Sequence, residues 1–301
     1  MKNRSHLAGS FPPLVTPFQD GEVDYAQYEQ LIEFHVSNGS NGVLVNGTTA
    51  EPSTLTTKER NQLVDLAVRA TAGALPVVAA TGSQSLEETK LLTRHAASAG
   101  VDALLIVTPY YIRPPQRGLV EYYRNVVDGI DTPWMIYNIP GRTACSISLE
   151  TLEVLRESTK SFVGMKHAVN DLGFVSECIA KFGPEFKVFV GLEELSFPMM
   201  AVGACGLMNA VGNLFPETLS RICDAVAVGN LKQGRNLHES LLEINQSVFY
   251  DTNPIPIKYM MKRMGLLKSN EHRLPMVPAT KELEARLDKV LESSRLFDCA
   301  G

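Results

Sequence analysis

Short apolar runs recur along the chain, and each is brief enough to be a buried strand rather than a helix. Between them, apolar residues return every three or four positions, which is the pattern of an amphipathic helix. The runs predicted as strands cover residues 14–15, 42–45, 76–80, 103–107, 134–137, 163–165, 187–190 and 206–211. The helices predicted between them include residues 24–38, 57–72, 85–99, 116–127 and 148–157.

Residues that favour helix ends support these boundaries. Ser85 opens a helical segment with Glu88 three positions on, which is the spacing of a capping box. Gly39, Gly73 and Gly100 follow helical segments and suit the left-handed turn that often ends a helix. Eight strands alternating with helices predict an α/β protein, a (β/α)8 TIM barrel. A doubly wound open sheet shows the same alternation and is the alternative.

The pattern changes after Pro216 and becomes helical throughout. Predicted helices there cover residues 219–228, 231–249, 257–264 and 280–294. The last three form a C-terminal helical extension. We therefore expect a barrel over residues 1–230 and a C-terminal helical region over residues 231–301.

Composition and charge narrow the classes of function. A chain of 301 residues with 45% hydrophobic residues can bury a large core, and its net charge of -5 gives no sign of a nucleic-acid partner. No apolar stretch approaches the roughly 20 residues of a membrane span, and residues 1–10 lack the apolar centre of a signal peptide. The cysteines have no CxxC spacing, so neither a zinc site nor a disulfide framework is indicated, and a reducing cytoplasm is the simplest location. The five cysteines are Cys145, Cys178, Cys205, Cys223 and Cys299.

Lys166 stands inside the apolar run 162–168. Burial disfavours the ammonium form of a lysine, and a neutral amine is a nucleophile that forms Schiff bases with carbonyl compounds. An ion pair, or a side chain that extends to the strand edge, is the ordinary explanation for one such lysine. Strand alternation points the neighbouring His167 the other way, which predicts a structural role for it.

Polar side chains gather where the predicted strands end, which is where barrels of this type have their active sites. The turn 47–49 offers backbone N–H groups and two threonine hydroxyls to a carboxylate. Tyr137 has a hydroxyl that could pass protons, and Arg142 could bind a second carboxylate. Each of these residues also has an ordinary structural explanation. No cluster there has the spacing of a metal site. This set of polar side chains therefore indicates carbonyl chemistry without a metal.

Five motifs in order give the chain a family resemblance. They are GTTxE at 47–51, TPYY at 108–111, YNxPxRT at 137–143, GxK at 164–166 and NPIPIK at 253–258. The set resembles the dihydrodipicolinate synthase / N-acetylneuraminate lyase family of pyruvate-dependent class I aldolases, from about residue 9 to residue 278. The resemblance implies a (β/α)8 barrel with C-terminal helices, usually assembled as a homotetramer, with a homodimer as the smaller alternative.

The resemblance also implies roles for single residues. Lys166 would form the Schiff base with pyruvate, so no cofactor is needed beyond this covalent imine. Tyr137 would relay protons, and Thr48 would link it to Tyr111 of the neighbouring subunit. Thr49, with the backbone of Thr48, would hold the pyruvate carboxylate.

The remaining implied roles concern the walls of the site. Arg142 would hold the carboxylate of the second substrate, and Gly191 and Met208 would line the pocket through their backbones. The YNxPxRT and TPYY motifs resemble the synthase branch, in which pyruvate and aspartate semialdehyde condense in lysine biosynthesis. The expected partners are therefore pyruvate and an aldehyde.

Several positions depart from the family pattern. Ala50 replaces a usual glycine, Pro52 a common serine, His167 a usual glutamate, and residues 192–194 an aspartate-rich turn. These changes leave open another 2-oxo acid aldolase or hydratase-lyase that acts on a sugar acid or an aromatic substrate. A non-catalytic barrel that binds a 2-oxo acid is the alternative of a different class. Pro52 and Arg60 also stand where lysine-regulated members bind their effector, which predicts that free lysine does not inhibit.

Overall fold

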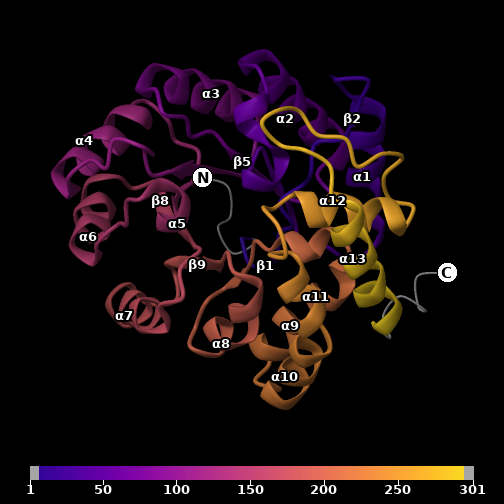
Figure 1. Cartoon of the computed structure of the whole chain (residues 1–301). Helices are drawn as coiled ribbons and strands as arrows, with labels where there is room; N and C mark the ends of the chain where they lie inside the picture. The colour runs from indigo at the N-terminus through magenta and orange to yellow at the C-terminus, as the bar shows by residue number, and fades with distance from the viewer. Residues whose placement is uncertain (1–6, 295–301) are drawn as a thin grey trace.

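Short parallel strands form a barrel at the centre of the computed structural model, which describes residues 7–294 (Figure 1). Within these residues one 8-stranded sheet has the order β1-β10-β9-β8-β7-β6-β5-β4, and every pairing in it is parallel. A parallel bridge between Pro13 and Leu44 joins its two ends. The predicted (β/α)8 barrel is confirmed. Its strands are β1 Gly9–Ser10, β4 Val43–Val45, β5 Val77–Ala80, β6 Ala103–Val107, β7 Trp134–Asn138, β8 Phe162–His167, β9 Lys187–Val190 and β10 Gly206–Leu207.

The first and last strands differ from the prediction. The first strand was expected at residues 14–15, but β1 lies at Gly9–Ser10, where it pairs with β10. Pro12 and Pro13 follow β1 and have no N–H to donate, so the regular ladder stops before the apolar residues that suggested a strand. The last strand ends at Leu207 rather than at residue 211, because the chain then enters a 3₁₀ turn at Ala210–Asn213.

Helices surround the barrel, and the predicted ones lie within a few residues of their expected bounds. Thr56 begins α2 with a complete capping box, in which Glu59 bonds back to the backbone N–H of Thr56. The hairpin of β2 (Phe18–Gln19) and β3 (Glu22–Val23) was not predicted, because two-residue strands leave no periodic signal. The surrounding helices are α1 Tyr25–Ser37, α2 Thr57–Thr71, α3 Leu86–Ala99, α4 Gln116–Val126, α5 Pro140–Thr143, α6 Leu149–Ser158, α7 Leu172–Phe182, α8 Ser196–Ala201 and α9 Pro216–Ala227.

The C-terminal helices gather on one side of the barrel, next to α9 (Figure 1). The single helix expected at 231–249 is two helices that meet at Leu241. The hydroxyl of Ser240 donates to the carbonyl of Leu237 at 2.7 Å, a local bond that competes with the helical pattern and favours a bend. The division of the chain at residue 230 stays a prediction. These helices are α10 Leu231–Ser240, α11 Leu242–Ser247, α12 Ile255–Arg263 and α13 Lys281–Ser293.

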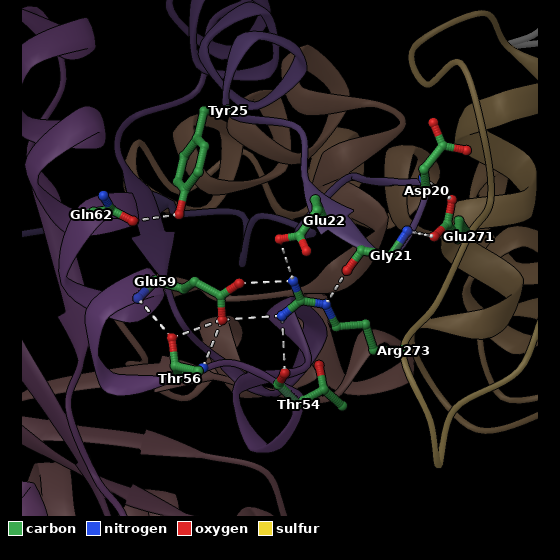
Figure 2. Close-up of polar contacts among 10 residues, drawn as sticks. All are labelled: Asp20, Gly21, Glu22, Tyr25, Thr54, Thr56, Glu59, Gln62, Glu271 and Arg273. Carbon is green, nitrogen blue, oxygen red and sulfur yellow. Dashed lines mark hydrogen bonds and ion pairs between the residues drawn. The ribbon is translucent and has the colours of Figure 1, made fainter.

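The segment between α12 and α13 is tied to the barrel by Arg273 (Figure 2). Its guanidinium pairs with both carboxylate oxygens of Glu59 at 2.7 and 3.1 Å, and it donates to the carbonyls of Gly21 and Thr54. The hydrogen bonds from Arg273 are the main reason that the pKa of Glu59 falls to about 2. The C-terminal segment is thus fixed against the first turn of α2, the loop before it and the turn of the β2–β3 hairpin. No helix within residues 7–294 has the length and apolar character needed to cross a membrane.

Candidate active site

A bulge in β8 decides which way Lys166 points. Trp134 of β7 lies opposite Phe162, but the next residue, Met135, lies opposite Gly164, so β8 contains one extra residue. An extra residue shifts every following side chain to the other face of a strand. Lys166 therefore lines the interior cavity and is only 3% exposed, and Met165 packs in the layer between barrel and helices.

Gly164 is required at this bulge. A Cβ at position 164 would lie 1.9 Å from the carbonyl oxygen of Lys187 on β9, far inside contact distance. On the outer face, His167 stacks on Phe174 of α7 with ring centroids 5.3 Å apart. Burial lowers the pKa of His167 to about 4, so the ring is neutral near pH 7. His167 is a packing residue on the outside of the barrel, as strand alternation predicts.

The turn after β4 carries the two threonines. Asn46 and Glu51 take left-handed conformations with φ of 57° and 56°, and the short 3₁₀ turn Thr48–Ala50 lies between them. Ala50 itself does not take a positive φ, which explains why a Cβ is tolerated where the family usually has glycine. The hydroxyl of Thr16 donates to the carbonyl of Ala50 at 2.7 Å and helps to fix the turn.

The hydroxyls of this turn point in two directions. The Oγ1 atom of Thr48 lies 3.4 Å from the Tyr137 hydroxyl, which is long for a bond between hydroxyls. The Oγ1 atom of Thr49 accepts a hydrogen bond from the side-chain amide of Asn253 at 3.0 Å. Lys166 completes the group, because its Nζ atom lies 4.5 Å from the ring centroid of Tyr137.

Most of the predicted site residues surround one small cavity. Its volume is about 60 Å³, and it lies at the carboxyl ends of the strands. Among the residues that line it are Thr48, Thr49, Tyr137, Arg142, Lys166, Gly191 and Met208. Tyr111 is the exception: it is 85% exposed and lines neither this cavity nor the larger one beside it. The structure of one chain thus assembles seven of the eight predicted residues.

A larger cavity of about 460 Å³ lies beside the first. The two share a wall made by Thr48, Tyr137, Ile139, Arg142 and Asn253. The larger cavity continues past Glu51 and Pro52 to Arg60 and Glu88. A small ligand on Lys166 would therefore have a second, larger space next to it.

Buried charges that the sequence reasoning missed lie behind the turn. Nζ of Lys258 is 2.9 Å from Oε1 of Glu51, and both side chains are almost completely buried. Nδ1 of His272 lies 3.0 Å from the other oxygen of Glu51. The signal available in the sequence was the 253–258 motif, which contains Asn253 and Lys258 but assigns no contact to them.

Glu193 is a second missed residue. It lines the small cavity together with Lys166 and is 3% exposed. Burial raises the pKa of its carboxyl, although the N–H of Ala210 donates to it at 2.7 Å and the charge of Lys166 favours the ionised form. The sequence marked residues 192–194 only as a departure from the family pattern.

In the part of the chain that the structure describes, no group of three or more His, Cys, Asp or Glu side chains could hold a metal ion. Of the five cysteines, Cys299 lies outside the described residues. The other four have free thiols.

Comparisons with known proteins agree with the geometry. Residues 6–294 match the model of the Dihydrodipicolinate synthetase family. A 4-hydroxy-tetrahydrodipicolinate synthase from Thermus thermophilus is 42% identical over 285 residues, which cover 94% of this chain and 95% of that protein. The crystal structure of dihydrodipicolinate synthase from Aquifex aeolicus matches with a TM-score of 0.93 and 38% identity, over 95% of this chain and 97% of that one. The structure of the Cyanidioschyzon merolae enzyme with lysine bound matches with a TM-score of 0.93 and 31% identity, over 97% and 99%.

Proposed function

Because the chain belongs to the dihydrodipicolinate synthetase family, we propose that it is a Schiff-base lyase of the 4-hydroxy-tetrahydrodipicolinate synthase type. Its substrates would be pyruvate and aspartate semialdehyde. One observation carries the proposal: a buried lysine amine lies over the ring of Tyr137, in a cavity whose wall includes the hydroxyl-bearing residues Thr48 and Thr49. That combination suits an imine on Lys166 and a carboxylate held beside it.

The chemistry begins at Lys166. Its amine attacks the C2 carbonyl of pyruvate, and loss of water from the resulting carbinolamine gives the imine. Loss of a proton from the methyl carbon then gives an enamine, whose carbon attacks the aldehyde of the second substrate. These steps need a group that accepts and returns protons. The Tyr137 hydroxyl, whose residue lines the same cavity as Lys166, would take this role, and the 3.4 Å between it and the Thr48 hydroxyl is expected to shorten once substrate is bound.

The remaining residues would bind and position the substrates. The Thr49 hydroxyl and the N–H groups of its turn would hold the pyruvate carboxylate. Arg142 would hold the carboxylate of the semialdehyde, since it lines both cavities. A Cβ at Gly191 would lie 2.9 Å from Cε of Lys166, so glycine there leaves room for the lysine, and the backbone of Met208 would close the same wall.

The active unit would contain more than one subunit. Tyr111 is exposed beside the exposed Ile112, which suits a residue that reaches a neighbour's site in a homodimer or homotetramer. The covalent imine would serve in place of any cofactor. The free thiols of the described cysteines are in keeping with a reducing cytoplasm as the location.

One observation favours a second candidate within the same chemistry. Glu193 places a buried carboxyl in the wall of the small cavity, where it could bind a hydroxyl group of a sugar-acid substrate. Steady-state turnover separates the two. Pyruvate with aspartate semialdehyde should give a higher kcat/KM than pyruvate with aromatic or sugar-derived aldehydes, or than cleavage of sugar-derived 2-oxo acids. A higher kcat/KM for any member of that panel would overturn the assignment of the second substrate.

A further inference from the structure

Asn253 lies where the two cavities meet. It precedes α12 in the C-terminal region, yet it lines both the small cavity around Lys166 and the larger one beside it. Its side-chain amide donates to the Thr49 hydroxyl at 3.0 Å, and its backbone carbonyl lies 3.5 Å from a guanidinium nitrogen of Arg142. One residue thus contacts both side chains assigned to substrate carboxylates.

The direction of the bond to Thr49 has a chemical consequence. A hydroxyl has one hydrogen to donate, and its oxygen can accept. Because the Asn253 amide already donates to this oxygen, the Thr49 hydrogen is free to point into the cavity. A hydroxyl held in this way is a donor, which is what a carboxylate needs.

Folding stability alone does not explain an asparagine at this position. The Oδ1 atom of Asn253 is buried and has no hydrogen-bond partner among the described residues. A buried polar atom without a partner costs stability. The residue therefore carries an unfavourable group in the wall of the site, which is more typical of a functional position than of a packing one.

A second contact from the same segment holds the other end of the turn. Lys258, five positions after Asn253 on α12, pairs with Glu51 at 2.9 Å in a fully buried environment. Glu51 directly follows the 3₁₀ turn that carries Thr48 and Thr49. The segment 253–258 thus contacts the turn at Thr49 and at Glu51, although it lies about 200 residues away along the chain.

We propose that Asn253 is a positioning residue that fixes the Thr49 hydroxyl as a hydrogen-bond donor to the carboxylate of the 2-oxo acid. The Lys258–Glu51 pair holds the backbone of the same turn in place. This inference rests on the proposed function, because it assigns a partner to the Thr49 hydroxyl. Through Asn253, the C-terminal region would be part of the pyruvate site and not only a support for the barrel.

Asn253→Asp is the direct test, because aspartate has the same shape but accepts hydrogen bonds when it is ionised. The carboxylate would take the Thr49 hydrogen and add a negative charge near the substrate. We expect the KM for pyruvate to rise at least about tenfold. The KM for aspartate semialdehyde should change less, because Arg142 contacts the backbone carbonyl of residue 253, which the substitution keeps. Asn230→Asp is the matched control, since Asn230 is an exposed helix cap where aspartate serves equally well.

A pH series distinguishes positioning from simple damage. Protonation turns the aspartate at position 253 into a neutral donor, so the ratio of its pyruvate KM to the wild-type value should fall as the pH is lowered. Asn253→Ala, which removes the donor without adding charge, should raise the same KM severalfold and keeps the test open if the aspartate variant does not fold. A wild-type pyruvate KM in either folded variant would overturn the proposal.

Borohydride trapping with saturating pyruvate separates this inference from the proposed function. Label on Lys166 in the wild-type protein supports the proposed function whatever the Asn253 variants do. If the wild-type protein takes up no label, the proposed function itself fails. If it is labelled and the Asn253 variants keep a normal pyruvate KM, only the positioning role fails.

Discussion

Lys166 and Tyr137 are paired neighbours on β8 and β7, and the lysine amine lies 4.5 Å from the centre of the tyrosine ring. The extra residue in β8 makes this arrangement, since without it Met165 would face the cavity in place of Lys166. The pairing brings a nucleophile and a proton-carrying hydroxyl to the same small cavity. The proposed imine chemistry depends on this pair.

Removal of the Tyr137 hydroxyl should slow the reaction without disturbing the fold. Tyr137→Phe keeps the buried ring but removes the proton carrier, and we expect kcat to fall by about 10²–10⁴-fold. Tyr25→Phe is the control, because its hydroxyl bonds to Gln62 on the outside of the barrel (Figure 2). Steady-state kinetics on both variants provide the measurement. A wild-type kcat for Tyr137→Phe would exclude the relay.

The buried ion pair behind the turn should be important for stability. Lys258→Met leaves the buried Glu51 carboxylate with only the His272 ring beside it, and loss of one partner of a buried ion pair typically costs about 3–5 kcal/mol of unfolding free energy. Urea denaturation measures the loss. The pair of the exposed Lys268 with the half-buried Asp24 is the control, and Lys268→Met should cost at most about 1 kcal/mol.

A double variant checks the cause of this loss. Glu51→Gln combined with Lys258→Met removes both charges, so it should be less destabilised than Lys258→Met alone. A double variant that is less stable than the single one would show that packing, and not the stranded charge, sets the cost.

Subunit mixing should reveal whether Tyr111 serves a neighbouring site. We expect Tyr111→Ala and Lys166→Ala to be inactive or nearly so when each is expressed alone. In a hybrid dimer, the subunit with an intact Lys166 would receive Tyr111 from its partner. Random co-expression should then restore about a quarter of the wild-type activity per site. If activity is not regained in verified hybrids, or if Tyr111→Ala is fully active alone, the shared site is wrong.

Free lysine is not expected to inhibit at millimolar concentration. Arg60 places a buried guanidinium in the larger cavity, and a like charge disfavours a bound ammonium group. Both carboxylate oxygens of Glu88 already accept hydrogen bonds, from the hydroxyls of Thr57 and Ser83. Initial rates measured against lysine concentration decide the point. Saturable inhibition in that range would show that the cavity binds lysine despite Arg60.

The sequence predicted the parts of the fold that leave a local signal. Unbroken apolar runs such as β6 (Ala103–Val107) and helices with clear caps such as α2 (Thr57–Thr71) fall close to their expected bounds. The strand β1 at Gly9–Ser10 escaped, because its two residues carry no apolar pattern and their pairing with β10 depends on distant backbone. Periodicity reports the local environment, and a two-residue strand has almost none.

The site residues, too, were predictable only where a local sequence signal marked them. Lys166 stood out because a charged residue in an apolar run is unusual by itself, and the motifs around it named its companions. The contacts of Asn253 with Thr49 and of Lys258 with Glu51 link residues more than 200 positions apart, and no local pattern encodes such a pairing. The bulge that turns Lys166 inward was also invisible, since Gly164 alone does not mark a bulge.

Borohydride reduction in the presence of pyruvate, followed by peptide mass spectrometry, shows directly whether Lys166 forms the imine. We expect one reduced pyruvate per chain on Lys166, none on the buried Lys258, and no adduct in folded Lys166→Ala. An adduct on a different lysine, or none at all in a folded wild-type sample, would contradict it.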